Sequence, residues 1–169
     1  MSIAPRIEAH LSRVGVDYDL IQHPESHSSL ASARLANVPA NQMAKAVITH
    51  DGDNYRLCVI PATHQLVPEL LDRHMGKNSH YRLVDESDLK TLFDDCEEGA
   101  IPALGQVYGL PVVWDKSLEA LPNIYFESGD HHNLIQVNHG SFMQLMGLQE
   151  NDVISCPTEF YEARTQLIH

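Results

Sequence analysis

The sequence predicts an α+β fold in a single domain that spans residues 1–169. Stretches with helical periodicity alternate along the chain with short β-branched runs, and an Asp-Gly turn joins two of these runs as in a hairpin. Helices mixed with hairpins favour α+β over a doubly wound α/β sheet. We therefore expect a mixed, mostly antiparallel sheet or a partial barrel of about six or seven strands, flanked by helices.

The first elements are two helices separated by a strand. Apolar residues at helical spacing predict a helix over residues 4–14, which Gly15 ends. The run 17–23 predicts a strand. Serine in the N-cap position begins a helix over 28–38, and Pro39 opens a further short turn or helix.

The next element is a hairpin. The β-branched runs 45–50 and 55–61 flank the turn sequence "DGDN". Lys45 begins the first strand and shares one strand face with Val47 and Thr49. Because its nearest neighbour on that face is apolar, we expect the Lys45 side chain to lean toward a cavity.

The remaining elements follow the same mixed pattern. Helical spacing predicts helices over 67–75, 86–93, 140–148 and 158–167, and apolar runs predict strands at 110–115, 123–128 and 134–138. The last helix is amphipathic, so it can pack on the domain or pair with another chain.

Composition restricts the class of protein. The chain is 43% hydrophobic, and it contains no apolar run near the roughly 20 residues that a membrane helix needs. The N-terminus lacks the basic start and apolar core of a signal peptide. The three cysteines are far apart without a CxxC pair, which indicates reduced thiols. We expect a cytoplasmic protein that does not bind a membrane.

Charge restricts the partners. The formal net charge of −12 at pH 7 disfavours binding to duplex DNA. A short basic stretch, residues 72–82, is either a local landing site for nucleic acid or a solvated surface segment.

Glycine and proline are concentrated in the stretch "CEEGAIPALGQVYGLPVVWD", residues 96–115. Gly99 and Gly105 can adopt backbone angles closed to other residues, and Pro102 stiffens the loop between them. Such a loop can direct backbone N–H groups at a carbonyl oxygen that becomes an oxyanion, which is the chemistry of acyl hydrolysis. The alternative is an ordinary turn between two elements.

Three motifs resemble a known family. The sequences "MAKAVITHDG", "GAIPALGQVYGLPVVWD" and "ESGDHHNLIQV" together resemble the YbaK and prolyl-tRNA synthetase-associated editing-domain family over about residues 5–147, which leaves 148–169 as an extension. Members of that family hydrolyse the ester of misacylated tRNA. The resemblance implies a deacylase that acts at the tRNA acceptor end on a small amino acid such as Ala, Ser, Thr or Cys, with an aminoacyl-tRNA synthetase as a further partner.

The resemblance also implies site residues. The catalytic ones are Lys45, near the terminal nucleotide of the tRNA; Gly99, in the loop that holds the aminoacyl group; and His132, which aligns slightly better than its neighbour with a substrate-contacting histidine. The closing proline of the family loop aligns with Ala103, whereas this chain has Pro102 one place earlier. Substrate binding is implied for His23, Ala100, Ile101, Pro102, Ala103, Gly105, Ser128, Gly129, Asp130 and His131.

The implied chemistry needs no cofactor and no metal, because a positioned water, the ribose hydroxyl of the tRNA and an oxyanion site suffice for an activated ester. Three alternatives compete with it. A metal could be drawn from the histidines, but Pro24 and the adjacency of His131 and His132 oppose a common ligand geometry. A Cys58 thiol would be buried and inert. The third alternative is a non-catalytic module that binds an aminoacyl or nucleotide ligand and regulates a synthetase.

Overall fold

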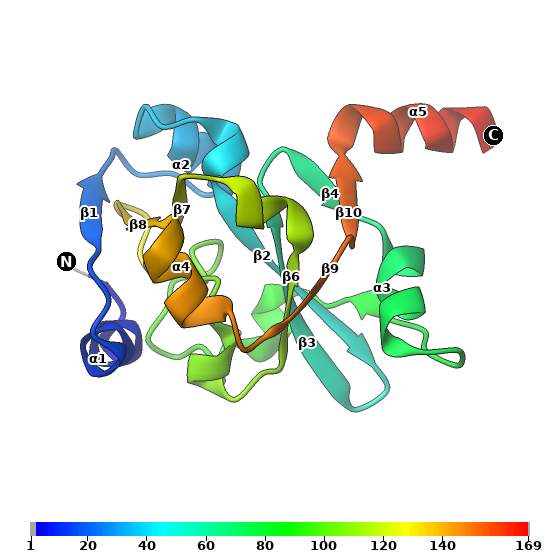
Figure 1. Ribbon diagram of the computed structural model, residues 1–169, viewed down its shortest axis with the longest axis horizontal. Helices are drawn as coiled ribbons and strands as arrows, with labels where there is room; N and C mark the ends of the chain where they lie inside the picture. Colours follow the sequence, from blue (N-terminus) through cyan, green and yellow to red (C-terminus); the bar gives the residue numbers. More distant parts are fainter. Residues whose placement is uncertain (1–2, 169) are drawn as a thin grey trace.

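Five α-helices and three small sheets make up the described part of the chain, residues 3–168, in this computed structural model; side chains are described for residues 3–163 (Figure 1). The expected α+β class is confirmed, with mixed sheets that do not close into a barrel among the described residues. The helices are α1 (Pro5–Val14), α2 (Ser29–Leu35), α3 (Pro68–Met75), α4 (His139–Met146) and α5 (Thr158–Ile168).

The largest sheet has five strands around the expected hairpin. Its order is β5 (Arg82–Leu83), β2 (Ala44–Asp51), β3 (Asn54–Pro61), β6 (Val112–Asp115) and β9 (Glu150–Asp152). The β2–β3 and β2–β5 pairs are antiparallel, whereas β6 runs parallel to both β3 and β9. Gly52 turns the hairpin with a φ of +61°, a left-handed angle that glycine adopts without strain.

A second sheet carries the turn that follows residue 127. Its order is β1 (Asp19–Gln22), β8 (Asn133–Asn138) and β7 (Asn123–Glu127), and both pairs are antiparallel. A bridge between Met43 and Tyr125 joins it to the start of β2. A third sheet pairs β4 (His64–Leu66) with β10 (Ser155–Pro157).

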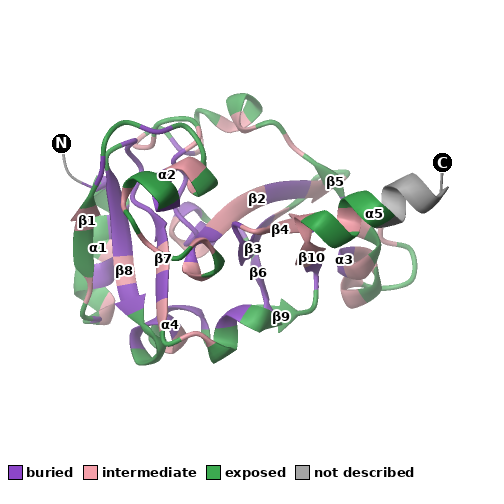
Figure 2. Cartoon of the chain, turned by 90° about the horizontal axis from the view of Figure 1, so that it is seen from above, coloured by how far each residue is buried: buried purple, intermediate pink, exposed green. Residues whose placement is uncertain are grey.

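The main core lies between the five-stranded and three-stranded sheets, where Figure 2 shows the strands as mostly buried. Trp114 of β6 packs edge-on against Phe142 of α4 with a centroid distance of 5.3 Å, and its indole N–H donates to the carbonyl of Met146 at 2.9 Å. Leu11 of α1 is fully buried in the same core.

Some expected elements differ from the structure. The helix expected over 86–93 is only a 3₁₀ turn, Glu86–Leu89, followed by turns up to residue 95. Phe93 is buried against the ring of Tyr108, with centroids 4.8 Å apart, so tertiary packing overrides the local helical spacing. The short strands β4, β5, β9 and β10 were not expected, because two or three residues are too few to show a period of two.

The segment after residue 147 is largely built into the fold. The strand β9 extends the five-stranded sheet, and the buried carboxylate of Asp115 accepts hydrogen bonds from the Ile154 N–H at 3.0 Å and the Ser155 hydroxyl at 2.6 Å. The expected helix over 158–167 is present as α5, which extends away from the body in Figure 1. Its side chains beyond residue 163 lie outside the described residues. None of the described helices combines the length and apolarity needed to cross a membrane.

Candidate functional site

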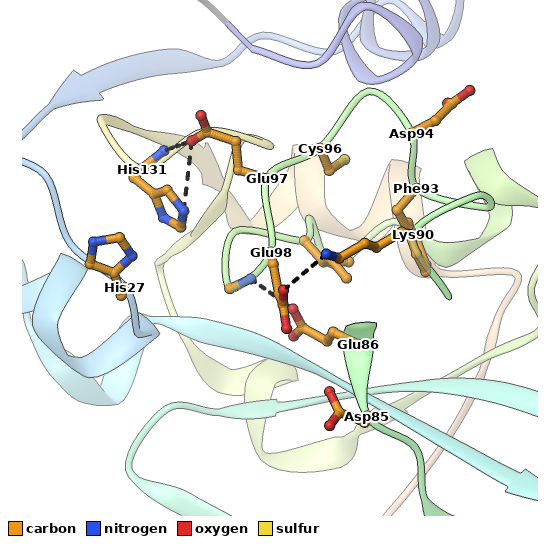
Figure 3. A pocket seen from close by; sticks show the side chains of 12 residues that line it. His27, Asp85, Glu86, Lys90, Phe93, Asp94, Cys96, Glu97, Glu98 and His131 are labelled. Atoms are coloured by element: carbon orange, nitrogen blue, oxygen red, sulfur yellow. Dashed lines mark hydrogen bonds and ion pairs between the residues drawn. The ribbon is translucent and has the colours of Figure 1, made fainter. Parts of the chain in front are cut away.

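A cavity of about 950 Å³ opens beside the glycine-containing loop (Figure 3). The loop contributes its residues from position 96 onward, the turn after β7 contributes His131, and the 3₁₀ turn at Glu86 closes the opposite side. Its lining consists of His27, Asp85, Glu86, Lys90, Phe93, Asp94, Cys96, Glu97, Glu98, Gly99, Ile101 and His131.

Hydrogen bonds hold the loop against the turn after β7. The Glu97 N–H donates to the Gly129 carbonyl at 2.7 Å, and the Glu97 carboxylate accepts from the His131 N–H at 3.0 Å. Within the loop, the Ala100 N–H donates to the Glu97 carbonyl at 3.0 Å. Two segments that are more than 30 residues apart in sequence therefore form one rigid wall of the cavity.

Gly99 lies at the centre of this wall. Its φ is +86°, and a β-carbon at this position would approach the His27 carbonyl oxygen to 3.0 Å. Its N–H donates to a carboxylate oxygen of Glu86 at 2.7 Å across the cavity. The Gly99 amide thus points into the cavity and binds an anionic oxygen there.

The turn between β7 and β8 is shaped by its polar residues. The Asp130 carboxylate accepts from the N–H groups of His132 and Asn133 at 2.9 and 2.8 Å, and from the Ser128 hydroxyl at 3.2 Å. Gly129, with a φ of +105°, lies so close to Ala4 that a β-carbon would come within 2.7 Å of its side chain. Ser128, Gly129 and Asp130 therefore position the turn rather than line the cavity.

The two adjacent histidines point in different directions. His131 is 9% exposed and lines the cavity, with its Nε2 atom 3.7 Å from the Glu97 carboxylate and its ring centroid 4.5 Å from that of His27. His132, for which we expect a catalytic role, is exposed to solvent. His131 is thus the histidine placed beside Gly99, and the catalytic role of His132 stays a prediction.

Two further polar atoms are buried beside this wall. The Nε2 atom of His23 and one carboxylate oxygen of Glu127 have no hydrogen-bond partner among the described residues, and the same holds for Nδ1 of His131. The backbone N–H of His23 donates to the His132 carbonyl at 2.9 Å, and its Nδ1 lies 2.7 Å from the Pro24 carbonyl oxygen. His23 therefore supports the turn from behind.

The other predicted loop residues divide into two groups. Ile101 lines the cavity together with Gly99. The remaining loop residues are buried and do not line the cavity: Ala100, Pro102, Ala103 and Gly105. At Gly105 a β-carbon would come within 2.8 Å of the Leu57 side chain, so this glycine permits close packing of the loop on β3.

Lys45 lies apart from the cavity lining. It is paired with Ile60 on the face of the hairpin that packs against the small cluster around Cys58, whereas Ala44 and Ile48 face the main core. Burial lowers the pKa of Lys45. Burial lowers the pKa of His64, on β4, and the charge of Lys45 adds to this lowering. The structure brings Gly99, Ile101 and His131 together at the cavity but does not bring Lys45 to it.

The cavity is acidic, which the motifs did not reveal. Five carboxylates line it against one lysine, and burial raises the pKa of Glu86, with the Gly99 hydrogen bond opposing this rise. Burial also raises the pKa of Glu127, behind the wall, to about 8. Single carboxylates have no diagnostic spacing, so the only sequence signal was the acidic run "DDCEE" at residues 94–98.

The alternative chemistries find little support in the geometry. Burial raises the pKa of the Cys58 thiol to about 11 and that of Cys96 to about 12, so both are protonated at neutral pH. Among the described residues no three His, Cys, Asp or Glu side chains are grouped so that they could hold a metal ion.

The fold and the site together define an α+β domain in which a glycine amide is directed into an acidic cavity. A family model described as an aminoacyl-tRNA editing domain matches residues 23–145, and the chain belongs to this family. The match includes Lys45, the loop and the turn, and it ends before β9.

Solved structures show the same fold at low sequence identity. A hypothetical protein is 18% identical with a TM-score of 0.78, covering 89% of this chain and 99% of that one. A protein described as a candidate trans-editing enzyme for prolyl-tRNA synthetase is also 18% identical, with a TM-score of 0.75 and coverage of 89% and 96%. A candidate signal transduction protein from Marinobacter aquaeolei is 15% identical with a TM-score of 0.72, covering 91% of this chain but 31% of that one. No curated protein matches the chain.

Proposed function

We propose that this chain is a trans-editing deacylase that hydrolyses the ester of misacylated tRNA carrying a small amino acid such as Ala, Ser, Thr or Cys. Membership of the aminoacyl-tRNA editing family supports the reaction class. The substrate would be the acceptor end of the tRNA in the cytoplasm, where a synthetase that produces the error would be a natural partner.

The observation that carries the proposal is the Gly99 N–H. It holds a carboxylate oxygen of Glu86 at 2.7 Å inside the cavity, so an oxyanion of similar charge and size fits the same amide. Donors about 2.7 to 3.1 Å from a developing oxyanion stabilise the transition state of acyl transfer. Loss of one such donor typically costs roughly a hundredfold to a thousandfold in rate.

The reaction would proceed by direct attack of water. Water adds to the ester carbonyl carbon, and the carbonyl oxygen becomes an oxyanion that accepts from the Gly99 N–H. When the tetrahedral intermediate collapses, the bond to the ribose oxygen breaks, and that oxygen leaves with a proton from the attacking water. A ribose hydroxyl of the tRNA would orient this water, so no side chain has to act as a general base.

Other residues would position the substrate. His131 lies close to Gly99, since a β-carbon on Gly99 would be 3.6 Å from the Cε1 atom of His131, and its ring can contact the aminoacyl group or the ribose. Ile101 adds an apolar wall suited to a small side chain. Lys45 would bind the terminal nucleotide from outside the cavity as a point charge.

A panel of charged tRNAs tests the proposal. The purified chain is incubated separately with tRNAs carrying Ala, Ser, Thr, Cys or Pro, and the remaining ester is measured over time. We expect at least one small amino acid to be released much faster than in the absence of protein. If every ester survives while the charged tRNA still binds, the chain is a binding module and the deacylase proposal is wrong.

A further inference from the structure

We propose that the cavity selects aminoacyl esters by their free, positively charged α-amine, and that the carboxylate of Glu86 binds this ammonium group. The selectivity rests on the proposed function, because it concerns the substrate of the same site. Binding of an aminoacyl group in the cavity would then depend on the charge of its amine as well as on the size of its side chain.

The carboxylates of the cavity differ in how their charges are balanced. Asp94 pairs with Arg6 at 3.0 Å. Glu98 lies 4.0 Å from Lys90, and Glu97 lies 3.7 Å from His131 (Figure 3). Asp85 and Glu86 have no ion-pair partner among the described residues, but Asp85 is exposed, whereas the Glu86 carboxylate is partly buried in the cavity. A partly buried and unpaired carboxylate favours binding of a cationic group.

The position of Glu86 fits the geometry of an aminoacyl ester. Its carboxylate already touches the Gly99 amide, at 2.7 Å, which is the donor proposed for the carbonyl oxygen. The amine and the carbonyl oxygen of such an ester are attached to adjacent carbons and lie roughly 3 Å apart. A substrate whose carbonyl oxygen accepts from the Gly99 N–H therefore places its ammonium group beside Glu86. The Glu86 carboxylate then binds a positively charged group in place of the neutral backbone amide.

His131 provides an independent sign that the cavity takes a ligand. The residue is 9% exposed and lines the cavity, and its buried Nδ1 atom has no hydrogen-bond partner among the described residues. Buried polar side-chain atoms in native proteins are nearly always hydrogen-bonded. The ring lies next to Gly99, since a β-carbon on Gly99 would be 3.6 Å from its Cε1 atom, so this unpartnered polar side chain borders the place where the ester would bind.

The negative charge of the lining also sets what the cavity excludes. Phosphate groups of the tRNA are repelled by the carboxylates, so the backbone of the nucleic acid stays outside and only the aminoacyl end enters. An ester of the same size without the ammonium would leave the charge of Glu86 unbalanced. We therefore expect discrimination against the α-hydroxy counterpart of an amino acid, which has nearly the same shape and no charge.

The test compares tRNA charged with alanine and the same tRNA charged with lactate, the α-hydroxy counterpart of alanine. Hydrolysis is followed at pH 6.5, below the pKa of roughly 7.7 to 8.0 of an α-amine, and each rate is divided by that of the ester without protein. We expect a preference of about tenfold to hundredfold for the alanyl ester, as for loss of a charge-assisted contact. Glu86→Gln keeps an oxygen for the Gly99 amide and should reduce this preference to below about threefold.

A binding measurement separates this selectivity from the reaction. The probes are two non-hydrolysable amides of 3′-amino-3′-deoxyadenosine, one with an alanyl and one with a lactyl group. Glu119→Gln, at an exposed position outside the cavity lining, is the matched control and should keep the full preference. Melting temperatures confirm that each variant folds.

The outcomes are distinct. Equal hydrolysis of both esters, with equal binding of both amides, would overturn the selectivity and leave the deacylase intact. Preferential binding of the alanyl amide without hydrolysis of either ester would overturn the deacylase and support the selectivity. A full preference retained in folded Glu86→Gln would show that Glu86 is not the ammonium-binding residue.

Discussion

Replacing Glu127 with glutamine should remove a strong dependence of stability on pH. The side chain is 3% exposed at the end of β7, directly before the turn that forms the cavity wall. Burial raises its pKa to about 8, the charges of Asp130 and Glu86 add to this rise, and a hydrogen bond with Ser32 opposes it. Glu127 therefore stays largely protonated in the folded protein at neutral pH.

The sign follows from proton binding in the two states. Between pH 4.5, the ordinary pKa of the carboxyl, and about pH 8, the folded chain holds a proton that the unfolded chain releases. The contribution of Glu127 to the free energy of unfolding is therefore highest below pH 4.5 and falls as the pH rises toward 8. One pKa unit corresponds to 1.36 kcal/mol, so the loss across this window is at most about 5 kcal/mol.

The assay is denaturant unfolding of the wild type and Glu127→Gln at pH 5.5, 7.0 and 8.5. Glutamine fills the same space and can still bond to Ser32, but it carries no charge at any pH. The free energy of unfolding of the wild type should fall relative to that of the variant by roughly 2 to 4 kcal/mol over this range. Histidine titrations are common to both proteins and cancel. Parallel pH curves would show that Glu127 is ionised in the folded state and would refute the reasoning.

Three further predictions concern residues of the loop, the turn and the hairpin. Lys45→Ala should lower deacylation by roughly a hundredfold with little change in melting temperature, because it removes a charge-assisted contact; wild-type turnover in the folded variant would exclude this role. His131→Gln should slow the reaction by at least tenfold, since this residue lines the cavity, and a comparable loss in His132→Gln would confirm the catalytic role that the family resemblance implies for His132. Gly105→Ala should destabilise by roughly 1 to 3 kcal/mol in thermal unfolding, because its β-carbon would meet Leu57 at 2.8 Å, while Gly52→Ala, with no atom within 4 Å, should cost only the strain of its positive φ.

Much of the fold could be predicted from local patterns. The hairpin of β2 and β3 follows from two β-branched runs around an Asp-Gly turn, and the helix α1 follows from apolar spacing and a glycine stop. Strands of two or three residues could not be predicted, because their pairing depends on contacts distant in sequence. The strand β9, for example, exists because residues 150–152 run beside β6.

The site could be predicted in part. The resemblance to the editing family indicated the loop and the turn, and the structure places Gly99, Ile101 and His131 at one cavity. The sequence did not show which of His131 and His132 lines the cavity. Neighbouring side chains along an extended chain point to opposite faces, but the sequence does not tell which of these faces is turned toward the cavity. The placement of Glu86 beside Gly99 depends on a 3₁₀ turn where local spacing indicated a helix.

The most direct test of the account is the single-turnover rate of deacylation for Gly99→Val and Gly52→Val, measured with the preferred charged tRNA. Both glycines have positive φ angles, +86° and +61°, so the backbone strain is comparable. Only at Gly99 would the new side chain crowd the cavity, where its β-carbon lies 3.0 Å from the His27 carbonyl oxygen. We predict that Gly99→Val loses at least a hundredfold in rate while Gly52→Val stays within about threefold of the wild type. Equal rates in two folded variants would contradict the claim that the Gly99 amide binds the reacting ester.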